Sequence, residues 1–237
     1  MSKKISTKMI QPSTMDIEVL VYLVGGIVFL IGSMCYLPVW GDYELGGWLF
    51  TIGSAGFLWA DGLECYKSYR THNNRVHITL KQDINILEAG GTNPTKTSIE
   101  KTFTNTGGDV CTMYSLIGSF LYLWGSICLL PEVNASFFGT LLFVLGSLAI
   151  TFSQGCKLMR LAEITNTCAY HVDAAAGMGG FLYFIGSILF LPSFFFVQTT
   201  FVAHIAPTVF TLGGIAFTWS GIAIFYQHFY GGFQKQH

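Results

Sequence analysis

Hydrophobic and polar stretches alternate along the chain, and six stretches are long and apolar enough to cross a membrane. They are residues 17–37, 45–66, 110–130, 137–156, 176–196 and 203–227, each with few or no charges at its centre. A membrane-spanning helix needs about 20 mainly apolar residues. The pattern therefore predicts an all-α integral membrane protein with six transmembrane helices.

These stretches share one motif: a small residue, an aromatic residue four positions later, and a second small residue three positions further on. In the first, third and fifth copies a Leu-Pro pair follows at 37–38, 130–131 and 191–192, so the copies pair into three tandem helical hairpins. Small residues let helices approach closely in lipid. We predict that the motif packs helices through Gly25, Phe29, Gly32, Gly46, Phe50, Gly53, Gly118, Tyr122, Gly125, Gly139, Phe143, Gly146, Gly179, Tyr183, Gly186, Phe210 and Gly213.

The predicted organisation follows from these repeats and from the polar stretches between them. The three hairpin units are residues 17–66, 110–157 and 176–230. Residues 1–16 and 231–237 are expected to be polar tails, 67–109 a soluble loop and 158–175 a short connector. Gly90-Gly91, Asn93-Pro94 and Gly107-Gly108 suggest turns in that loop.

Composition and charge support a membrane location and predict its orientation. Hydrophobic residues make up 51% of the chain and charged residues 11%, and the mean hydropathy is +0.52. All 12 basic residues lie in the tails, the 67–109 loop or the 157–175 region, whereas the three tight turns carry only Asp42, Glu44 and Glu132. Because cytoplasmic flanks are rich in Lys and Arg, both termini are predicted to be cytoplasmic. The sequence leaves open which membrane holds the protein.

Asp61 and Glu64 are the most unusual ionisable residues, because they share a helical face inside the second hydrophobic stretch. An acidic pair within a membrane suggests a proton or cation site. The alternative, which we favour, is a snorkelling or salt-bridged pair, since Lys67 and Arg70 follow closely. The position aligned with Asp61 in the second unit is Gln154, so the pair is not repeated. Asn134 begins an Asn-x-Ser acceptor sequence in a turn too short to leave the bilayer surface, so its glycosylation stays open.

No catalytic motif accompanies these residues, and we expect neither an enzyme nor a cofactor or metal site. The expected partners are the lipid bilayer and either a second copy of the chain or another membrane protein, with no nucleic acid. Two functions remain: a non-catalytic scaffold or assembly subunit, which we favour, and a passive channel or transporter for ions or small solutes. The candidate conduit residues are Ser33, Ser54, Asp61, Glu64, Ser126, Ser147, Gln154 and Ser187.

The run Gly46-Gly-Trp48-Leu-Phe50-Thr-Ile-Gly53-Ser54-Ala-Gly-Phe57 resembles the YrhK-like domain, a family of small two-helix membrane proteins. The second unit is similar but lacks the Trp, and the third departs most, with a longer turn and no Ser in its second copy. The resemblance implies a helical-hairpin fold and a membrane location. It implies no established activity.

Overall fold

The computed structural model describes residues 14–88, 96–161, 167–191 and 200–230, and its side chains over 17–71, 110–159, 169–191 and 204–230. These residues form six α-helices and no β-strand. The helices are α1 (Thr14–Cys35), α2 (Tyr43–Glu88), α3 (Lys96–Leu129), α4 (Ser136–Leu161), α5 (Thr167–Phe190) and α6 (Thr200–Phe229).

Five of the six helices are long and apolar enough to cross a membrane, as expected of a membrane protein. The spans are Ile17–Cys35, Val110–Leu129, Ser136–Met159, Ala169–Phe190 and His204–Phe229. The predicted span in α2 is not among them. That stretch carries Asp61 and Glu64 beside several glycines, which lowers its hydropathy. A sixth span therefore remains a prediction.

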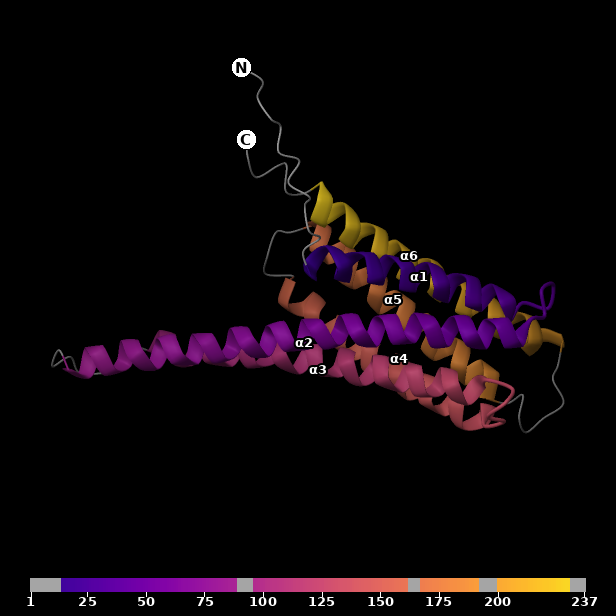
Figure 1. Cartoon of the computed structure of the whole chain (residues 1–237), viewed down its shortest axis with the longest axis horizontal. Coiled ribbons are helices and arrows are strands. Elements are labelled where there is room, and N and C mark those ends of the chain that lie inside the picture. The colour runs from indigo at the N-terminus through magenta and orange to yellow at the C-terminus, as the bar shows by residue number, and fades with distance from the viewer. Residues whose placement is uncertain (1–13, 89–95, 162–166, 192–199, 231–237) are drawn as a thin grey trace, which may run out of the picture.

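The six helices form a closed ring. Each helix packs against its neighbours in the sequence, and α6 packs back against α1. Figure 1 shows α1 and α6 together along one side of the bundle and α3 and α4 together along the opposite side. The start of α1 and the end of α6 lie at the same end of the bundle. The ring therefore has one axis, with each hairpin contributing one third of the wall.

Two helices extend beyond the ring, where the sequence predicts a loop over 67–109. The 46 residues of α2 correspond to about 69 Å of helix, more than twice the membrane core of about 30 Å. Figure 1 shows α2 and α3 leaving the bundle together as a long arm. The predicted turn at Gly107-Gly108 is wrong, because both residues lie inside α3. Polar residues are compatible with an exposed helix. The other two predicted turns, at 90–91 and 93–94, lie at or beyond the ends of α2 and α3, outside the described residues.

Two further boundaries differ from those expected. His171 and Asp173, which fall in the predicted 158–175 connector, lie in the first turns of α5. The stretch predicted to begin at residue 203 lies inside α6, which begins at Thr200 and contains Pro207. α5 ends at Phe190, and the part of the predicted stretch 176–196 beyond Leu191 lies outside the described residues.

Within each hairpin the motif packs reciprocally. A Cβ added to Gly53 would lie 2.5 Å from a ring carbon of Phe29, and one added to Gly32 would lie 3.1 Å from the ring of Phe50. The same exchange, in which the aromatic residue of one helix covers the second glycine of its partner, joins Tyr122 to Gly146, Phe143 to Gly125, Tyr183 to Gly213 and Phe210 to Gly186. The first small residue of each copy is covered as well: Gly25 by Phe57, Gly46 by Tyr36, Gly118 by Ile150, Gly139 by Gly125 and Cys128, and Gly179 by Phe217. The motif thus joins the two helices of one hairpin.

The seam between α1 and α6, which closes the ring, depends on other glycines. A Cβ added to Gly214 would lie 2.7 Å from the Cα of Leu30, and one added to Gly221 would lie 2.8 Å from the Cα of Leu23. From α1, a Cβ on Gly26 would lie 2.9 Å from the Cα of Thr218. Backbone meets backbone here, so only glycine allows this approach. At these glycines the backbones of the first and last helices are in direct contact.

Candidate functional site

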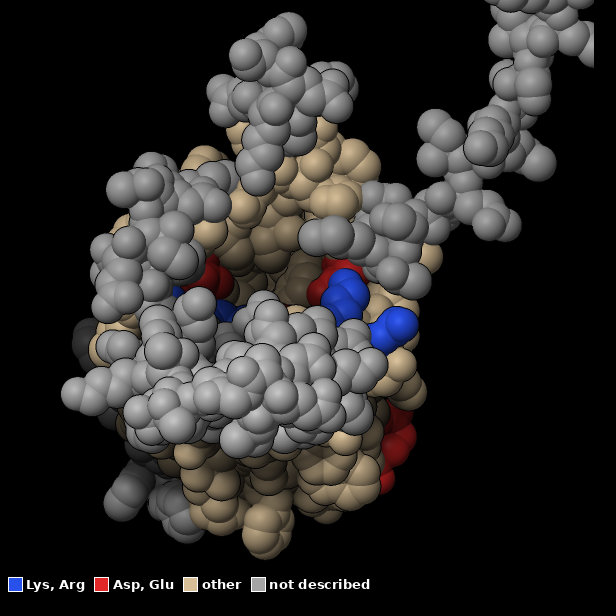
Figure 2. Space-filling view, turned by 90° about the vertical axis from the view of Figure 1, so that its left-hand side faces the viewer, with Lys and Arg blue, Asp and Glu red and all other residues tan. Residues whose placement is uncertain are grey.

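A cavity lies on the axis of the ring, at the end where α2 and α3 leave the bundle, and residues of all six helices line it. Its volume is about 40 Å³, which gives room for about three water-sized groups. Figure 2 looks at this end of the molecule and shows a hollow with acidic and basic side chains on two sides of it. We call this space the axial cavity. It is the candidate functional site, because ligand sites are concave and combine apolar walls with a few polar groups.

The lining residues occupy aligned positions of the three predicted units. Tyr22, Ser115 and Ala176 each precede the first glycine of a hairpin by three residues. Phe57, Ile150 and Phe217 follow the second glycine of the returning helix by four, and Asp61, Gln154 and Gly221 come four residues later. Ser119 and Ser220 complete the wall. The three units therefore bring equivalent positions to one place but fill them with different chemistry.

Asp61 is the only acidic residue in that lining. Its side chain is 4% exposed, and Tyr22 donates a hydrogen bond to Oδ1 while Ser119 donates one to Oδ2. A carboxylate offers about four lone-pair positions, so two acceptor positions remain for a ligand. The preferred sequence interpretation, a snorkelling or salt-bridged Asp61, is therefore wrong. The carboxylate points inward, because hydroxyl groups of α1 and α3 hold it there.

Gln154 supplies the second polar group of the cavity. The residue is 8% exposed, and its Oε1 has no hydrogen-bond partner among the described residues. An unsatisfied buried acceptor costs about 1–3 kcal/mol. Such a group is retained most readily where a ligand donates to it. Gln154 and Asp61, which align in the sequence, thus both line the same cavity.

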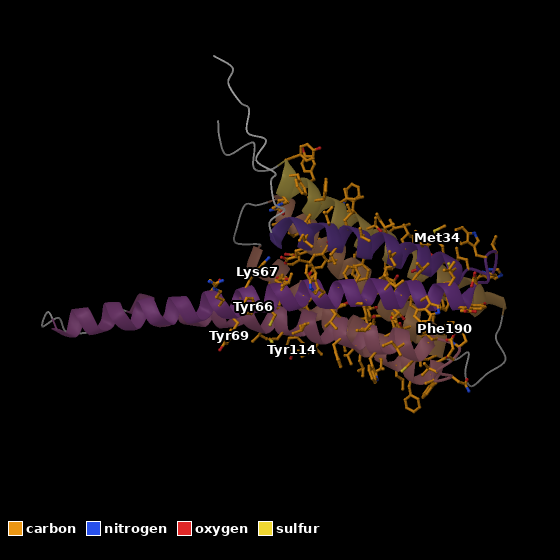
Figure 3. The ribbon with its side chains drawn as sticks, in the orientation of Figure 1. Met34, Tyr66, Lys67, Tyr69, Tyr114 and Phe190 are labelled. Atoms are coloured by element: carbon orange, nitrogen blue, oxygen red, sulfur yellow. The ribbon has the colours of Figure 1, made fainter. Side chains whose placement is uncertain are left out.

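Ion pairs surround the mouth of the cavity. Glu64 pairs with Lys157 of α4 at 2.8 Å, and Lys67 pairs with Glu18 of α1. Glu64 is therefore salt-bridged, as favoured from the sequence, but its partner is Lys157 rather than Lys67 or Arg70. Figure 3 shows Lys67 where α2 leaves the bundle, while Met34 and Phe190 lie toward the opposite end. Both pairs link different helices, so they brace the mouth of the cavity.

Below the cavity, aromatic rings fill the axis. Phe29, Tyr122 and Tyr183, the motif aromatics of α1, α3 and α5, form a near-equilateral triangle with ring centroids 5.5–6.0 Å apart. Phe50 packs against Phe29 and Tyr183 from the next layer. Phe29, Tyr122 and Tyr183 are fully buried. This aromatic layer fills the axis between the axial cavity and the opposite end of the ring.

The candidate conduit serines lie inside the ring but do not line the cavity. Ser33, Ser54, Ser126, Ser147 and Ser187 are all fully buried. Ser33 lies 2.6 Å from the Tyr183 hydroxyl and donates to the Phe29 carbonyl, while Ser147 lies 2.8 Å from the Tyr122 hydroxyl. Ser54 contacts Ser126 across the seam between the first two hairpins, at 3.1 Å. Ser187 Oγ has no hydrogen-bond partner among the described residues. Of the predicted conduit residues, only Asp61 and Gln154 meet at the cavity.

Sequence reasoning did not identify Tyr22, Ser115 and Ser119 as site residues. The alignment of the repeats could have identified them, because Tyr22 and Ser115 occupy equivalent positions and Ser119 follows a motif glycine. Positions that align in hairpins arranged around one axis must face that axis together. As to metals, the described residues contain no group of three or more His, Cys, Asp or Glu side chains placed to hold an ion.

Comparison with known families finds a match in the first hairpin. Residues 17–60 match the family of the YrhK-like protein, which agrees with the resemblance of the Gly46–Phe57 run. The matched segment includes Tyr22 and Phe57 of the cavity wall and ends one residue before Asp61. No curated protein and no solved structure matches the chain. The tandem arrangement of three such units remains a prediction.

Proposed function

We propose that the protein is a gated membrane conduit for small solutes, with the axial cavity as its solute site and the aromatic layer as its closed gate. The observation that carries this proposal is that all six helices contribute to one cavity on the axis of the ring, with a buried carboxylate and a buried amide in its mainly apolar wall. A bundle that existed only to pack would gain stability by filling this space with apolar side chains. A buried carboxylate and an unsatisfied amide in a membrane protein are costly, and such groups typically mark solute pathways.

The packing motif also favours a conduit over a scaffold. Its glycines are covered by atoms of the same hairpin, most of them on aromatic side chains, so they do not form an open stripe for a partner helix. The exposed side chains around the ring include large apolar ones such as Ile52, Phe120 and Trp219, as expected for contact with lipid. The helices of the ring therefore cover one another's motif glycines and turn large apolar side chains outward.

A scaffold or assembly subunit is the second candidate, and one observation favours it. The arm formed by α2 and α3 extends well beyond the ring, to Glu88 on one side and from Lys96 on the other. A long helical hairpin offers a surface on which another protein can dock. If the protein is a scaffold, no solute crosses the membrane through the cavity.

Flux through the purified full-length protein in liposomes tests the conduit. Phe29→Ala removes the ring that contacts five other aromatic residues in and beside the layer, so vesicles with this variant should leak small solutes faster than wild-type vesicles. The matched control is Phe120→Ala, because Phe120 is 54% exposed on the outside of the same bundle. Equal tightness of both variants, with folding verified by tryptophan fluorescence, would refute the gate and favour the scaffold.

A further inference from the structure

We propose that the axial cavity binds ammonium or a small primary alkylammonium ion, with Asp61 as its counter-ion and the Gln154 carbonyl as a second acceptor. This inference names the solute class for the site described above. It depends on the proposed conduit only for the passage of the ion through the membrane, because binding itself needs no flux.

The hydrogen bonds of the cavity wall leave mainly acceptors for a ligand. The hydroxyl protons of Tyr22 and Ser119 are donated to Asp61, and that of Ser220 is donated to the carbonyl of Val172 at 3.0 Å. The oxygens of these hydroxyl groups keep free lone pairs, as does the Asp61 carboxylate. Gln154 Oε1 adds an acceptor with no protein donor. These acceptors favour a ligand that donates hydrogen bonds, which is what an ammonium group does.

The charge of the cavity points to a cation with a single charge. Among the described residues, Lys157 and Lys67 pair with Glu64 and Glu18, and neither forms an ion pair with Asp61. Asp61 thus contributes one negative charge that no described basic side chain contacts. A buried charge requires a partner, and the cavity gives a monovalent cation access to it.

The walls and the size of the cavity favour a small organic cation over a metal ion. The rings of Phe57 and Phe217 pack at a tilt with their centroids 5.7 Å apart, and the centroid of the Tyr22 ring lies 5.9 Å from that of Phe57. Aromatic faces attract ammonium groups through cation–π interactions. A hard metal ion instead prefers oxygen ligands on all sides. With room for about three water-sized groups, the cavity accepts ammonium or methylammonium, whereas the bulkier tetramethylammonium lacks both the fit and the N–H donors.

Equilibrium binding of radiolabelled methylammonium to the purified full-length protein in detergent tests this inference. We expect saturable binding that unlabelled ammonium displaces and that sodium and tetramethylammonium, at equal ionic strength, do not. Asp61→Asn keeps the shape of the side chain but removes its charge, and Gln154→Leu removes the free acceptor. Each should weaken binding about tenfold or more, as expected for the loss of a charge-assisted hydrogen bond.

Glu44→Gln is the charge control, since it removes one carboxylate from an exposed position in the first turn of α2, away from the cavity lining. It should leave methylammonium binding unchanged. Absence of saturable binding to folded protein would overturn the inference, as would displacement by sodium as effective as displacement by ammonium. Equal losses in Asp61→Asn and Glu44→Gln would also overturn it. Intact binding combined with vesicles that stay tight would instead refute the conduit and leave the binding site standing.

Discussion

Replacement of Gly214 by alanine tests whether α6 closes the ring against α1. The added Cβ would lie 2.7 Å from the Cα of Leu30 and 3.1 Å from its backbone nitrogen. Carbon atoms in favourable contact are about 3.5–4.0 Å apart, so the two helices must separate by about 1 Å. Because the obstacle is backbone, no change of side-chain rotamer relieves it. We expect the seam to loosen along its length.

The expected loss of stability follows from comparison with Gly155→Ala. Gly155 lies in α4, and a Cβ added there meets nothing within 4 Å. Both substitutions gain the same helix propensity, about 1 kcal/mol, so this contribution cancels in their difference. Overpacking of a tight contact costs about 1–3 kcal/mol. Gly214→Ala should therefore be less stable than Gly155→Ala by this amount, which corresponds to about 2–12 °C in the midpoint of thermal unfolding.

Tryptophan fluorescence during heating in detergent measures both midpoints. Gly221→Ala, at 2.8 Å from the Cα of Leu23, should behave like Gly214→Ala, because it lies two turns further along the same seam. Equal midpoints for Gly214→Ala and Gly155→Ala would show that α1 and α6 do not approach as closely as described. The axial cavity would then lose one of its walls, and both proposals that depend on it would fail.

Two further predictions use buried polar groups. Ser33→Ala should lower the unfolding free energy by about 1 kcal/mol, because the buried Tyr183 hydroxyl loses its shorter hydrogen bond and keeps the longer one, at 3.4 Å, to the Phe29 carbonyl. Ser187→Ala at the aligned position should be neutral or stabilising, since Ser187 Oγ has no partner among the described residues. Thermal unfolding of the two variants side by side checks this, and an equal loss would contradict it. Gln154→Leu should reduce the rise in the unfolding midpoint that methylammonium salts give the wild-type protein, because the acceptor that would bind the ion is gone. An equal rise in both proteins would contradict this.

The helical hairpins could be predicted from sequence because the motif carries its own packing geometry. An aromatic residue four positions after one glycine and three before another places the ring between two notches, and each described hairpin uses this arrangement. The arm could not be predicted in the same way. Val76, Leu80, Ile84 and Leu87 recur at helical spacing, but they are few among polar residues, and a mainly polar helix resembles a polar loop in its sequence.

The site could be predicted only in part. Asp61 and Gln154 stand out as polar residues in apolar stretches, and their alignment is visible in the sequence. The partners Tyr22 and Ser119 could not be recognised, since Tyr and Ser are common at membrane interfaces and helix contacts. The distinction between an inward and a snorkelling Asp61 depends on which helix lies opposite, and that depends on closure of the ring.

The departures of the third hairpin explain why the cavity carries a single negative charge. Gly214 stands where the other returning helices have Ser54 and Ser147, and Gly221 stands where they have Asp61 and Gln154. At both positions the backbone of α1 leaves no room for a Cβ. The third unit therefore cannot contribute a polar side chain there, and only two of the three aligned positions are free to do so. With one of them an acid and the other an amide, the ring presents one carboxylate and one neutral acceptor, and this combination matches a monovalent cation that donates hydrogen bonds.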